Sequence, residues 1–364
     1  MNGFPFENTY MKIAVIVPSL RDLAPVQVAM AVAVQLARAG LPVTVYYFLT
    51  SSGSREIEGI KFKKINFFSH IPWNEYDIIH SHGFLPDTFV SLRKPGRCLA
   101  KSVTTIHNYV FPELKMLYNP VVALIIGRSW VRMWKRMDHM VVLTDDALKY
   151  YHTILPNKQV SRIYNGKNII QDPSVILPKH RLLAEEIRKK YTYCIGTIAA
   201  LITRKRIDIL IRHLSRVETG GMLILGDGSE RNHLEDLVAE HKLQNRVKFL
   251  GYIPGAQVYN ELFDISAFPS ISEGFSLSLI EAALYQKKIV SSDIPAFREA
   301  FTDAEVTFFN SHDELTIDQA IQEAWQDNEK PKNALSKAME RYSEERMGKE
   351  YEELFRRLLP PVTE

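Results

Sequence analysis

Two glutamates, Glu273 and Glu281, stand eight positions apart where a predicted strand gives way to a predicted helix. The strand covers residues 265–268, and the helix begins at about Ser276. An i, i+3, i+7 spacing puts the apolar residues of the helix on one face, and Glu281 shares that face. A carboxylate beside an apolar stripe costs several kcal/mol unless a protein donor or the hydroxyls of a ligand bind it. The apolar residues of this face are Leu277, Ile280 and Leu284.

The start of this helix offers a second kind of chemistry. Its first backbone N–H groups, from about Leu277 and Ser278, have no partner within the helix and form a ready site for an anion. Glu281 lies about one turn further along. An acid in the loop, free amides and a second acid would suit a sugar, a phosphate and a ribose in sequence. The alternative is an N-cap at Ser276 and two glutamates in salt bridges.

A basic loop, Thr203-Arg204-Lys205-Arg206, follows a predicted strand over 194–199. Three cations at the carboxyl end of a strand suit a diphosphate, because arginine donates through a planar fork and lysine supplies a point charge. Gly226, Asp227 and Gly228 follow the next strand, where glycines permit a tight turn and close approach to a ligand. The alternatives are a solvated basic turn and an ordinary strand-to-helix turn.

Histidines follow or end two predicted strands of the first half of the chain. His107 comes directly after the strand 102–106, so it lies at a carboxyl end, where ligands of α/β sheets bind. The alternative is a structural histidine. His80 and His82 could share one face, but no third ligand is visible, which argues against zinc. The chain also lacks an Asp-x-Asp metal motif, so we expect cations and amides, without a metal, to stabilise a leaving diphosphate.

The run Glu273-Gly274-Phe275-Ser276-Leu277-Ser278-Leu279-Ile280-Glu281-Ala282 resembles the E-x7-E signature of the retaining glycosyltransferases of family GT4, which have the GT-B fold. It departs at Ser276, where the family more often has glycine. The resemblance covers roughly residues 160–300 and implies that Glu273 and the backbone of Gly274–Leu277 hold the donor sugar. It also implies that Glu281 binds ribose, and we expect ribose hydroxyls, with no internal Arg or Lys, to satisfy this acid.

The resemblance extends to the basic loop, with one departure. Lys205 matches a family lysine that holds the donor pyrophosphate. Ala200 stands where the family has arginine, and Ala199 stands at the preceding glycine. Arg204 or Arg206 could supply the missing charge from another direction.

Three further segments match the family. Gly226-Asp227-Gly228 resembles its GDG-x-E-R element, and Phe249-Leu250-Gly251 follows at the expected distance. The resemblance places Tyr252 and Ile253 beside the nucleobase. It also implies that His107 contacts the donor sugar near the reacting carbon.

Composition is that of an ordinary globular protein of 364 residues, with 46% hydrophobic and 24% charged residues. This length allows two domains, and a net charge of +3 does not imply nucleic acid. Two distant cysteines, no membrane-spanning run and no signal peptide favour the cytoplasm. Residues 1–10 read as an extension before the first strand.

Short β-branched runs alternate with helical patterns, which predicts an α/β protein with parallel sheets. Together with the resemblance, this gives a GT-B fold of two Rossmann-like, doubly wound domains facing across a cleft. We place the acceptor-side domain at 11–170, with a helix at about 345–364 packing back on it, and the donor-binding domain at 191–344. Strands are predicted at 12–17, 43–48, 61–66, 77–80, 102–106, 139–143, 160–164, 194–199, 221–225, 247–250, 264–269, 287–291 and 305–309.

A basic helical segment lies at 118–137. Its cations share one side, and basic helices with tryptophan can rest on anionic lipid at the inner face of a membrane. The alternative is a core helix with a solvated basic face. The first loop, 18–25, has no glycine, although the family's is usually rich in it. The cations are Arg128, Arg132, Lys135 and Arg136.

We predict a glycosyltransferase that moves a sugar from a nucleotide-diphosphate sugar to a glycan or lipid-linked acceptor, in bacterial surface polysaccharide or lipopolysaccharide synthesis. Retention is implied by the family, and front-face attack is the hypothesis because no second carboxylate for a covalent intermediate is evident. No cofactor or nucleic-acid partner is expected. Two alternatives are a catalytically silent sugar-nucleotide binding subunit, which Ala200 motivates, and a GT-B sugar-nucleotide epimerase.

Overall fold

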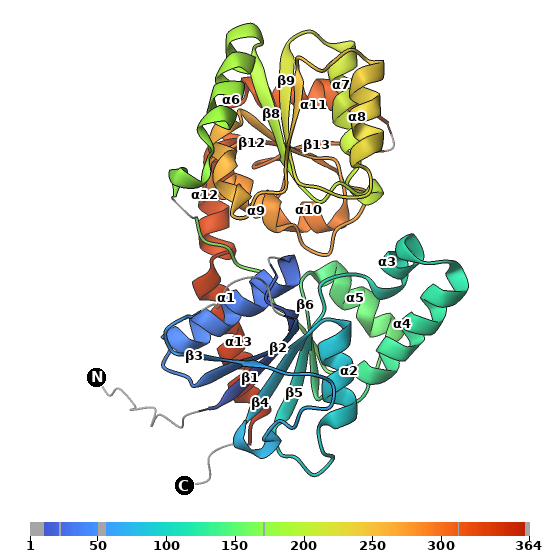
Figure 1. Cartoon of the computed structure of the whole chain (residues 1–364), viewed down its shortest axis with the longest axis vertical. Coiled ribbons are helices and arrows are strands. Elements are labelled where there is room, and N and C mark those ends of the chain that lie inside the picture. Colours follow the sequence, from blue (N-terminus) through green and yellow to red (C-terminus); the bar gives the residue numbers. More distant parts are fainter. Residues whose placement is uncertain (1–10, 22, 50–55, 170–171, 312, 361–364) are drawn as a thin grey trace. The chain divides into compact units, whose positions relative to one another are not determined.

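The computed structural model describes residues 11–21, 23–49, 56–169, 172–311 and 313–360. They belong to two compact units (Figure 1). The first unit contains residues 1–166 and 344–364, and the second contains residues 167–343. The predicted N-terminal extension, 1–10, lies outside the described residues.

The first unit is built on a parallel sheet with the strand order β3-β2-β1-β4-β5-β6-β7 within the described residues. Its central strands are apolar on both faces because helices cover both sides of the sheet (Figure 1). The strands are β1 Ile13–Ser19, β2 Val43–Leu49, β3 Ile60–Lys64, β4 Ile78–His82, β5 Lys101–Thr105, β6 His139–Val142 and β7 Val160–Arg162. The helices are α1 Ala24–Arg38, η1 Trp73–Glu75, α2 Phe84–Arg93, α3 Val110–Leu117, α4 Pro120–Trp134, α5 Asp145–Ile154 and α13 Glu344–Leu358.

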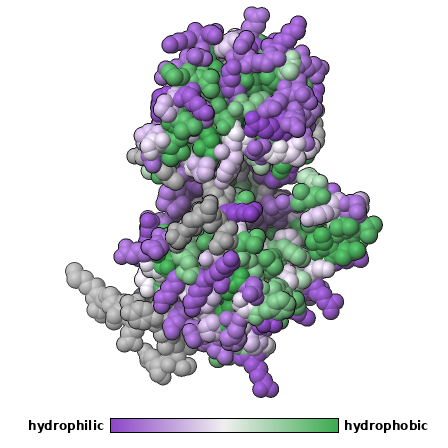
Figure 2. Space-filling model, in the orientation of Figure 1, coloured by the Kyte–Doolittle hydropathy of each residue, from purple (hydrophilic) through white to green (hydrophobic). Residues whose placement is uncertain are grey.

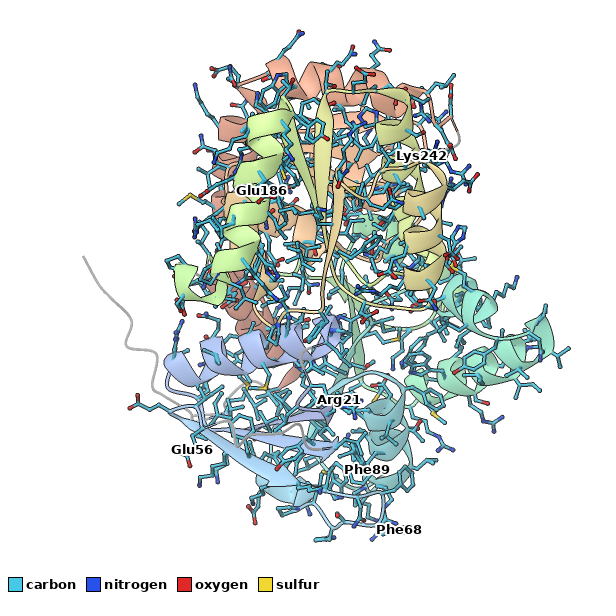
Figure 3. All side chains as sticks on the ribbon, turned by 45° about the horizontal axis from the view of Figure 1, so that its top comes forward. Arg21, Glu56, Phe68, Phe89, Glu186 and Lys242 are labelled. Atoms are coloured by element: carbon cyan, nitrogen blue, oxygen red, sulfur yellow. The ribbon has the colours of Figure 1, made fainter. Side chains whose placement is uncertain are left out.

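Aromatic packing fixes α2 and α13 to this sheet. Phe89 of α2 is fully buried and its ring meets those of Phe48 and Phe67 edge-on, whereas Phe68 is exposed at the surface (Figure 3). Tyr351 of α13 is also fully buried, and its hydroxyl lies 2.8 Å from Thr105 Oγ1 at the end of β5. The last long helix is therefore part of the first unit's core.

The second unit has a parallel sheet with the order β10-β9-β8-β11-β12-β13 within the described residues. Its strands are β8 Tyr193–Ile198, β9 Gly220–Leu225, β10 Val247–Gly251, β11 Ile265–Phe268, β12 Lys288–Ser292 and β13 Thr307–Phe309. Its helices are η2 Pro173–Val175, α6 Pro178–Lys190, η3 Thr203–Lys205, α7 Ile207–Arg216, α8 Arg231–Glu240, η4 Ala256–Leu262, α9 Leu277–Leu284, α10 Pro295–Ala300, α11 Thr316–Gln326 and α12 Lys330–Arg341.

Each sheet reverses its direction of growth once. In the first unit the reversal lies between β1 and β4, and in the second it lies between β8 and β11. Ligands of doubly wound sheets bind outside the carboxyl ends of the strands at such a point. The predicted site residues follow β8, β9, β10 and β11 in one unit and β5 in the other. Every predicted strand is present, and the doubly wound fold class is confirmed.

Candidate active site

Glu273 lies in a cluster of charged and polar side chains beyond the ends of β8 and β11. Its side chain is only 7% exposed. Glu273 Oε1 accepts a hydrogen bond from Ser270 Oγ at 2.8 Å and lies 2.5 Å from Lys205 Nζ. Glu273 Oε2 lies 2.9 Å from Arg204 Nη1. We call these four residues the Glu273 cluster. Two cations and one hydroxyl satisfy its carboxylate.

The charges of the Glu273 cluster balance in favour of an ionised acid. Burial raises the pKa of Glu273, but Lys205 and Arg204 lower it further, so that it lies below its ordinary value. The carboxylate therefore neutralises part of the positive charge of both cations in the free protein. An anion that binds here must compete with Glu273 for them.

Only one of the two arginines offered as a substitute for the family's arginine lies in the cluster. Arg204 Nη1 also donates to the carbonyl of Ser272 at 2.7 Å. Arg206 takes the left-handed conformation, with φ of 49°, and its guanidinium pairs with Asp208 at 3.1 Å and Glu314 at 3.0 Å. Arg204, not Arg206, therefore brings a second cation to the position beside Lys205.

The glycine loop after β9 packs on the loop after β8. A Cβ at Gly226 would lie 1.8 Å from the carbonyl oxygen of Ala199, and one at Gly228 would lie 2.3 Å from that of Leu201. Leu201 N donates a hydrogen bond to the carbonyl of Asp227 at 3.0 Å. The side chain of Asp227 is exposed. The packing of these two loops against each other is therefore enough to require glycine at both positions, with or without a ligand.

The remaining residues that were predicted to bind the donor follow β10 and β11 of the second sheet. Tyr252 follows β10 and is 59% exposed. Ile253 beside it is half-buried against the core. Gly274 is buried, and the ring of Phe275 packs on that of Tyr342 at 5.7 Å.

Helix α9 begins as predicted, but the expectation for Glu281 is wrong. Ser276 is the N-cap, and its Oγ accepts a hydrogen bond from Leu279 N at 3.3 Å. Glu281 Oε1 lies 3.0 Å from Lys167 Nζ, with both side chains largely buried. Lys167 N donates to the carbonyl of Tyr342 at 2.7 Å, which holds the lysine beside α9. An internal cation therefore satisfies Glu281, and its burial alone is no argument for a ribose.

His107 belongs to a buried cluster of histidines in the first unit. We call His80, His82 and His107 the histidine cluster. His82 Nδ1 lies 3.0 Å from His107 Nε2, and the rings of His80 and His82 are 4.2 Å apart. His80 Nε2 lies 2.8 Å from Thr105 Oγ1, which in turn bonds Tyr351. His80 and His82 are fully buried and His107 is half-buried.

Comparison with known proteins decides the family. Residues 181–341 match the family model for glycosyl transferases group 1. The O-antigen biosynthesis glycosyltransferase WclY of Escherichia coli is 32% identical to this chain over 314 residues, which cover 85% of this chain and 87% of WclY. The chain belongs to the group 1 glycosyl transferases. The predicted GT4-type family is confirmed, and retention stays a prediction.

Solved structures share the fold of this group 1 glycosyltransferase. Sucrose-phosphate synthase from Thermosynechococcus elongatus matches with a TM-score of 0.78 at 17% identity, over 96% of this chain and 99% of the synthase. Anabaena Alr3699/HepE, in complex with UDP and glucose, matches with a TM-score of 0.80 at 18% identity, over 95% of this chain and 100% of HepE. Both confirm the GT-B class.

The histidine cluster predicts how the stability of this glycosyltransferase changes with pH. Burial lowers the pKa of His80 to about 3 and that of His107 to about 4, and it also lowers the pKa of His82. Below about pH 6.5 the unfolded chain binds protons that the folded chain does not. The contribution of these histidines to the free energy of unfolding is therefore fully present above about pH 6.5 and is lost toward pH 4. Each histidine lowers the free energy of unfolding by up to about 1.4 kcal/mol for each pH unit.

We expect the urea concentration at the unfolding midpoint to decrease as the pH is lowered from 6.5 to 5. In this range the paired carboxylates are still ionised. His80→Phe should make that slope shallower, because one buried imidazole is gone. His152→Gln removes an exposed histidine of the same unit and should leave the slope as in the parent chain. Equal slopes in all three proteins would contradict the assignment.

The predicted basic segment forms an exposed helical hairpin with an apolar tip. Arg128 and Arg132 are exposed on α4, whereas Lys135 and Arg136 follow its end, where Trp134 is buried. Apolar side chains gather over α3 and α4 (Figure 2). None of the described helices combines the length and apolarity needed to cross a membrane. The exposed apolar residues of this hairpin are Met116, Leu117, Tyr118, Val121, Leu124 and Ile125.

Sequence reasoning missed two partners of the candidate residues. His82 was considered only as a metal ligand, and no group of three His, Cys, Asp or Glu among the described residues could hold a metal ion. Its contact with His107 follows from the register of β4 and β5, which pairs His82 with Thr105. Lys167 fell within the predicted acceptor-side domain, 11–170, and no signal in the sequence places it beside α9.

Proposed function

We propose that this glycosyltransferase transfers a sugar from a nucleotide-diphosphate sugar to a glycan or lipid-linked acceptor in O-antigen or lipopolysaccharide-type synthesis, with retention. The Glu273 cluster is the observation that carries this proposal, because it sets two cations and an acid beside the start of α9. WclY, named for O-antigen biosynthesis, supports the acceptor class. HepE was solved with UDP and glucose, so UDP-sugars are the first donors to test.

The diphosphate is received by the cations and by the free amides of α9. Lys205 and Arg204 exchange Glu273 for the diphosphate oxygens, and the N–H groups at Leu277 and Ser278 add dipoles aimed at the same charge. The bond between the anomeric carbon and the diphosphate oxygen breaks, and its electron pair leaves with the nucleoside diphosphate. In this proposal the two cations and the amides stabilise the charge on the leaving diphosphate without a metal ion. Full transfer activity in the presence of EDTA is the expected result.

The sugar and nucleoside are held by the remaining residues. Glu273, released from its cations, and the backbone of Gly274–Leu277 bind the sugar hydroxyls. His107 orients the sugar near its anomeric carbon. The acceptor hydroxyl attacks from the face that the diphosphate leaves, and its proton passes to a departing phosphate oxygen. The Gly226–Gly228 loop borders the donor, and Tyr252 with Ile253 flanks the base.

Glu281 is proposed to exchange Lys167 for the ribose hydroxyls. Glu281→Gln should raise the KM for the donor by about 10- to 100-fold, because a hydrogen bond to a charged group is worth about 1.5–3 kcal/mol. The turnover number should change less. Lys167→Met is the matched control: it frees the acid, so the KM should stay the same or fall. A KM that is unchanged in Glu281→Gln would remove ribose binding from this residue.

A panel of UDP-, GDP- and ADP-sugars, read first by thermal shift and then by product formation, tests the whole proposal. A donor that binds the native state raises the unfolding temperature by mass action. Transfer to a lipid-linked glycan is the expected result. Stabilisation without turnover would instead indicate a silent binding subunit, and conversion of the donor without an acceptor would indicate an epimerase.

We further propose that the α3–α4 hairpin rests on the inner face of an anionic membrane, where a lipid-linked acceptor is held. Exposed apolar side chains next to Arg128 and Arg132 suit the boundary between acyl chains and anionic headgroups. Each cation near such a surface contributes about 1 kcal/mol. Lys135 and Arg136 add to the same charge.

Sedimentation with vesicles tests the membrane contact. Arg128→Ser with Arg132→Ser should weaken binding to vesicles that contain anionic phospholipid by about 10- to 30-fold at low salt. Lys61→Ser with Lys64→Ser removes two exposed cations from β3 of the same unit and should leave binding unchanged. Equal losses in both variants would show a general charge effect and contradict a specific surface.

A further inference from the structure

His82 reaches His107 because their strands are neighbours in the first sheet. The register of β4 and β5 sets His82 beside Thr105, two residues before His107. His82 Nδ1 and His107 Nε2 are 3.0 Å apart, and the two rings are tilted by 33°. This is the distance of a hydrogen bond, so one of the two nitrogens carries the shared proton.

The other nitrogen of His82 shows which ring donates. His82 Nε2 is buried and has no hydrogen-bond partner in the described part of the chain. A buried N–H without an acceptor is rarer and costlier than a bare nitrogen. Burial also lowers the pKa of both rings, so each carries a single proton at neutral pH. The proton of His82 therefore lies on Nδ1 and is donated to His107 Nε2.

This bond fixes the proton of His107 on the opposite side of its ring. Because His107 Nε2 accepts, its own proton must lie on Nδ1. His107 is half-buried as a residue, whereas His82 is fully buried. The ring of His80 packs against the ring of His82, with 4.2 Å between the ring centres. His80 Nε2 is in turn within hydrogen-bond distance of Thr105 Oγ1.

We propose that His82 is a positioning residue that fixes the tautomer of His107, so that His107 presents Nδ1–H as a neutral hydrogen-bond donor to an oxygen of the donor sugar. The contact with sugar rests on the proposed function, whereas the tautomer rests on the histidine pair alone. A fixed donor would be ready before the substrate arrives and would cost no reorganisation during transfer.

Two variants of His82 separate the hydrogen bond from the bulk of the ring. In His82→Asn the amide nitrogen can take the place of Nδ1 and still donate to His107. In His82→Leu the apolar bulk remains and the donor is lost. The tautomer is read from NMR spectra of the full chain labelled with ¹⁵N in the histidine rings, and His107→Asn assigns the signals of His107.

We expect His107 to carry its proton on Nδ1 in the parent chain and in His82→Asn, and to lose this fixed preference in His82→Leu. A proton on Nε2 of His107 in the parent chain, or the same tautomer in His82→Leu, would overturn the inference. Thermal unfolding of each variant shows whether the first unit is still folded. If His82→Leu does not fold, the parent spectrum with that of His82→Asn still tests the tautomer.

Kinetics then test what the tautomer does. The turnover number should fall by about 10-fold or more in His82→Leu and return to within about threefold of the parent value in His82→Asn, with the donor KM little changed. Full activity of His107→Leu, which keeps apolar bulk but has no donor at the position of Nδ1, would reject the sugar contact and leave the tautomer standing. Equal losses in His82→Leu and His82→Asn would reject positioning through the hydrogen bond.

Discussion

Replacing Glu273 with glutamine should lower the rate of sugar transfer by about 100- to 10,000-fold and raise the affinity for the nucleoside diphosphate product. The two effects have opposite signs because Glu273 has two roles. It is proposed to hold the sugar during transfer, and in the free protein it neutralises Lys205 and Arg204 at 2.5 and 2.9 Å. A neutral glutamine leaves both cations available to an anion.

Lys205→Met should give the complementary result. It removes one cation from the diphosphate, so affinity for UDP, or whichever diphosphate the donor panel identifies, should fall by about 10- to 100-fold together with the transfer rate. Isothermal titration calorimetry with the nucleoside diphosphate and a transfer assay measure the two quantities separately. The matched control is Arg206→Met, since this cation of the same loop is engaged by Asp208 and Glu314.

A shared anion site predicts that affinity for the diphosphate rises in Glu273→Gln, falls in Lys205→Met and stays unchanged in Arg206→Met. Neither a structural ion pair nor an effect of overall charge predicts all three results. If Glu273→Gln and Lys205→Met both lose affinity, the Glu273 cluster is a structural ion pair. If Arg206→Met loses as much affinity as Lys205→Met, the effect is one of overall charge and the cluster does not bind the diphosphate.

The strands and the start of α9 could be predicted because their signals are local. Near-continuous runs such as Ile13–Val17 fit buried parallel strands, and a serine before an apolar helix predicts its N-cap. Thr144, just before α5, follows the same rule, and its Oγ1 accepts a hydrogen bond from Ala147 N. Such features need only a few consecutive residues.

The partners of the candidate residues could not be predicted, because they depend on contacts across the fold. Lys167 is 114 positions before Glu281, and only the path of the chain beside α9 brings them within 3.0 Å. The choice between Arg204 and Arg206 depends on a left-handed residue at 206, a conformation that arginine seldom adopts and that no sequence pattern here announces. Motifs predicted the candidate residues, and packing determined which charged groups they contact.

Asp87 is the residue outside the candidate site whose loss should cost the most stability. It lies in α2 and is 1% exposed. Its Oδ1 accepts hydrogen bonds from Ser81 and Thr104 at 2.7 and 2.8 Å. Its Oδ2 accepts from the indole N–H groups of Trp130 and Trp134 at 2.9 and 2.8 Å. Burial raises the pKa of Asp87, and these four donors oppose that rise.

Asp87→Ala should destabilise the first unit by about 3–5 kcal/mol, because three buried donors and the half-buried Trp130 lose their acceptor at once. Urea unfolding followed by tryptophan fluorescence measures the change, since two of the four tryptophans donate to this carboxylate. Asp87→Asn keeps the size of the side chain but turns an amide N–H group toward other donors. Its loss of unfolding free energy should therefore lie between those of the parent chain and Asp87→Ala. Asp236→Ala, at an exposed position of α8, should leave this transition unchanged.

The same variant links the buried carboxylate to the surface of α4. Trp130 and Trp134 both belong to α4, so the loss of Asp87 should loosen the helix that also presents Arg128 and Arg132. Vesicle binding of Asp87→Asn, measured where the protein is still folded, should therefore fall although no surface residue has changed. Unaltered binding together with a loss of stability would show that α4 keeps its place through its apolar contacts alone.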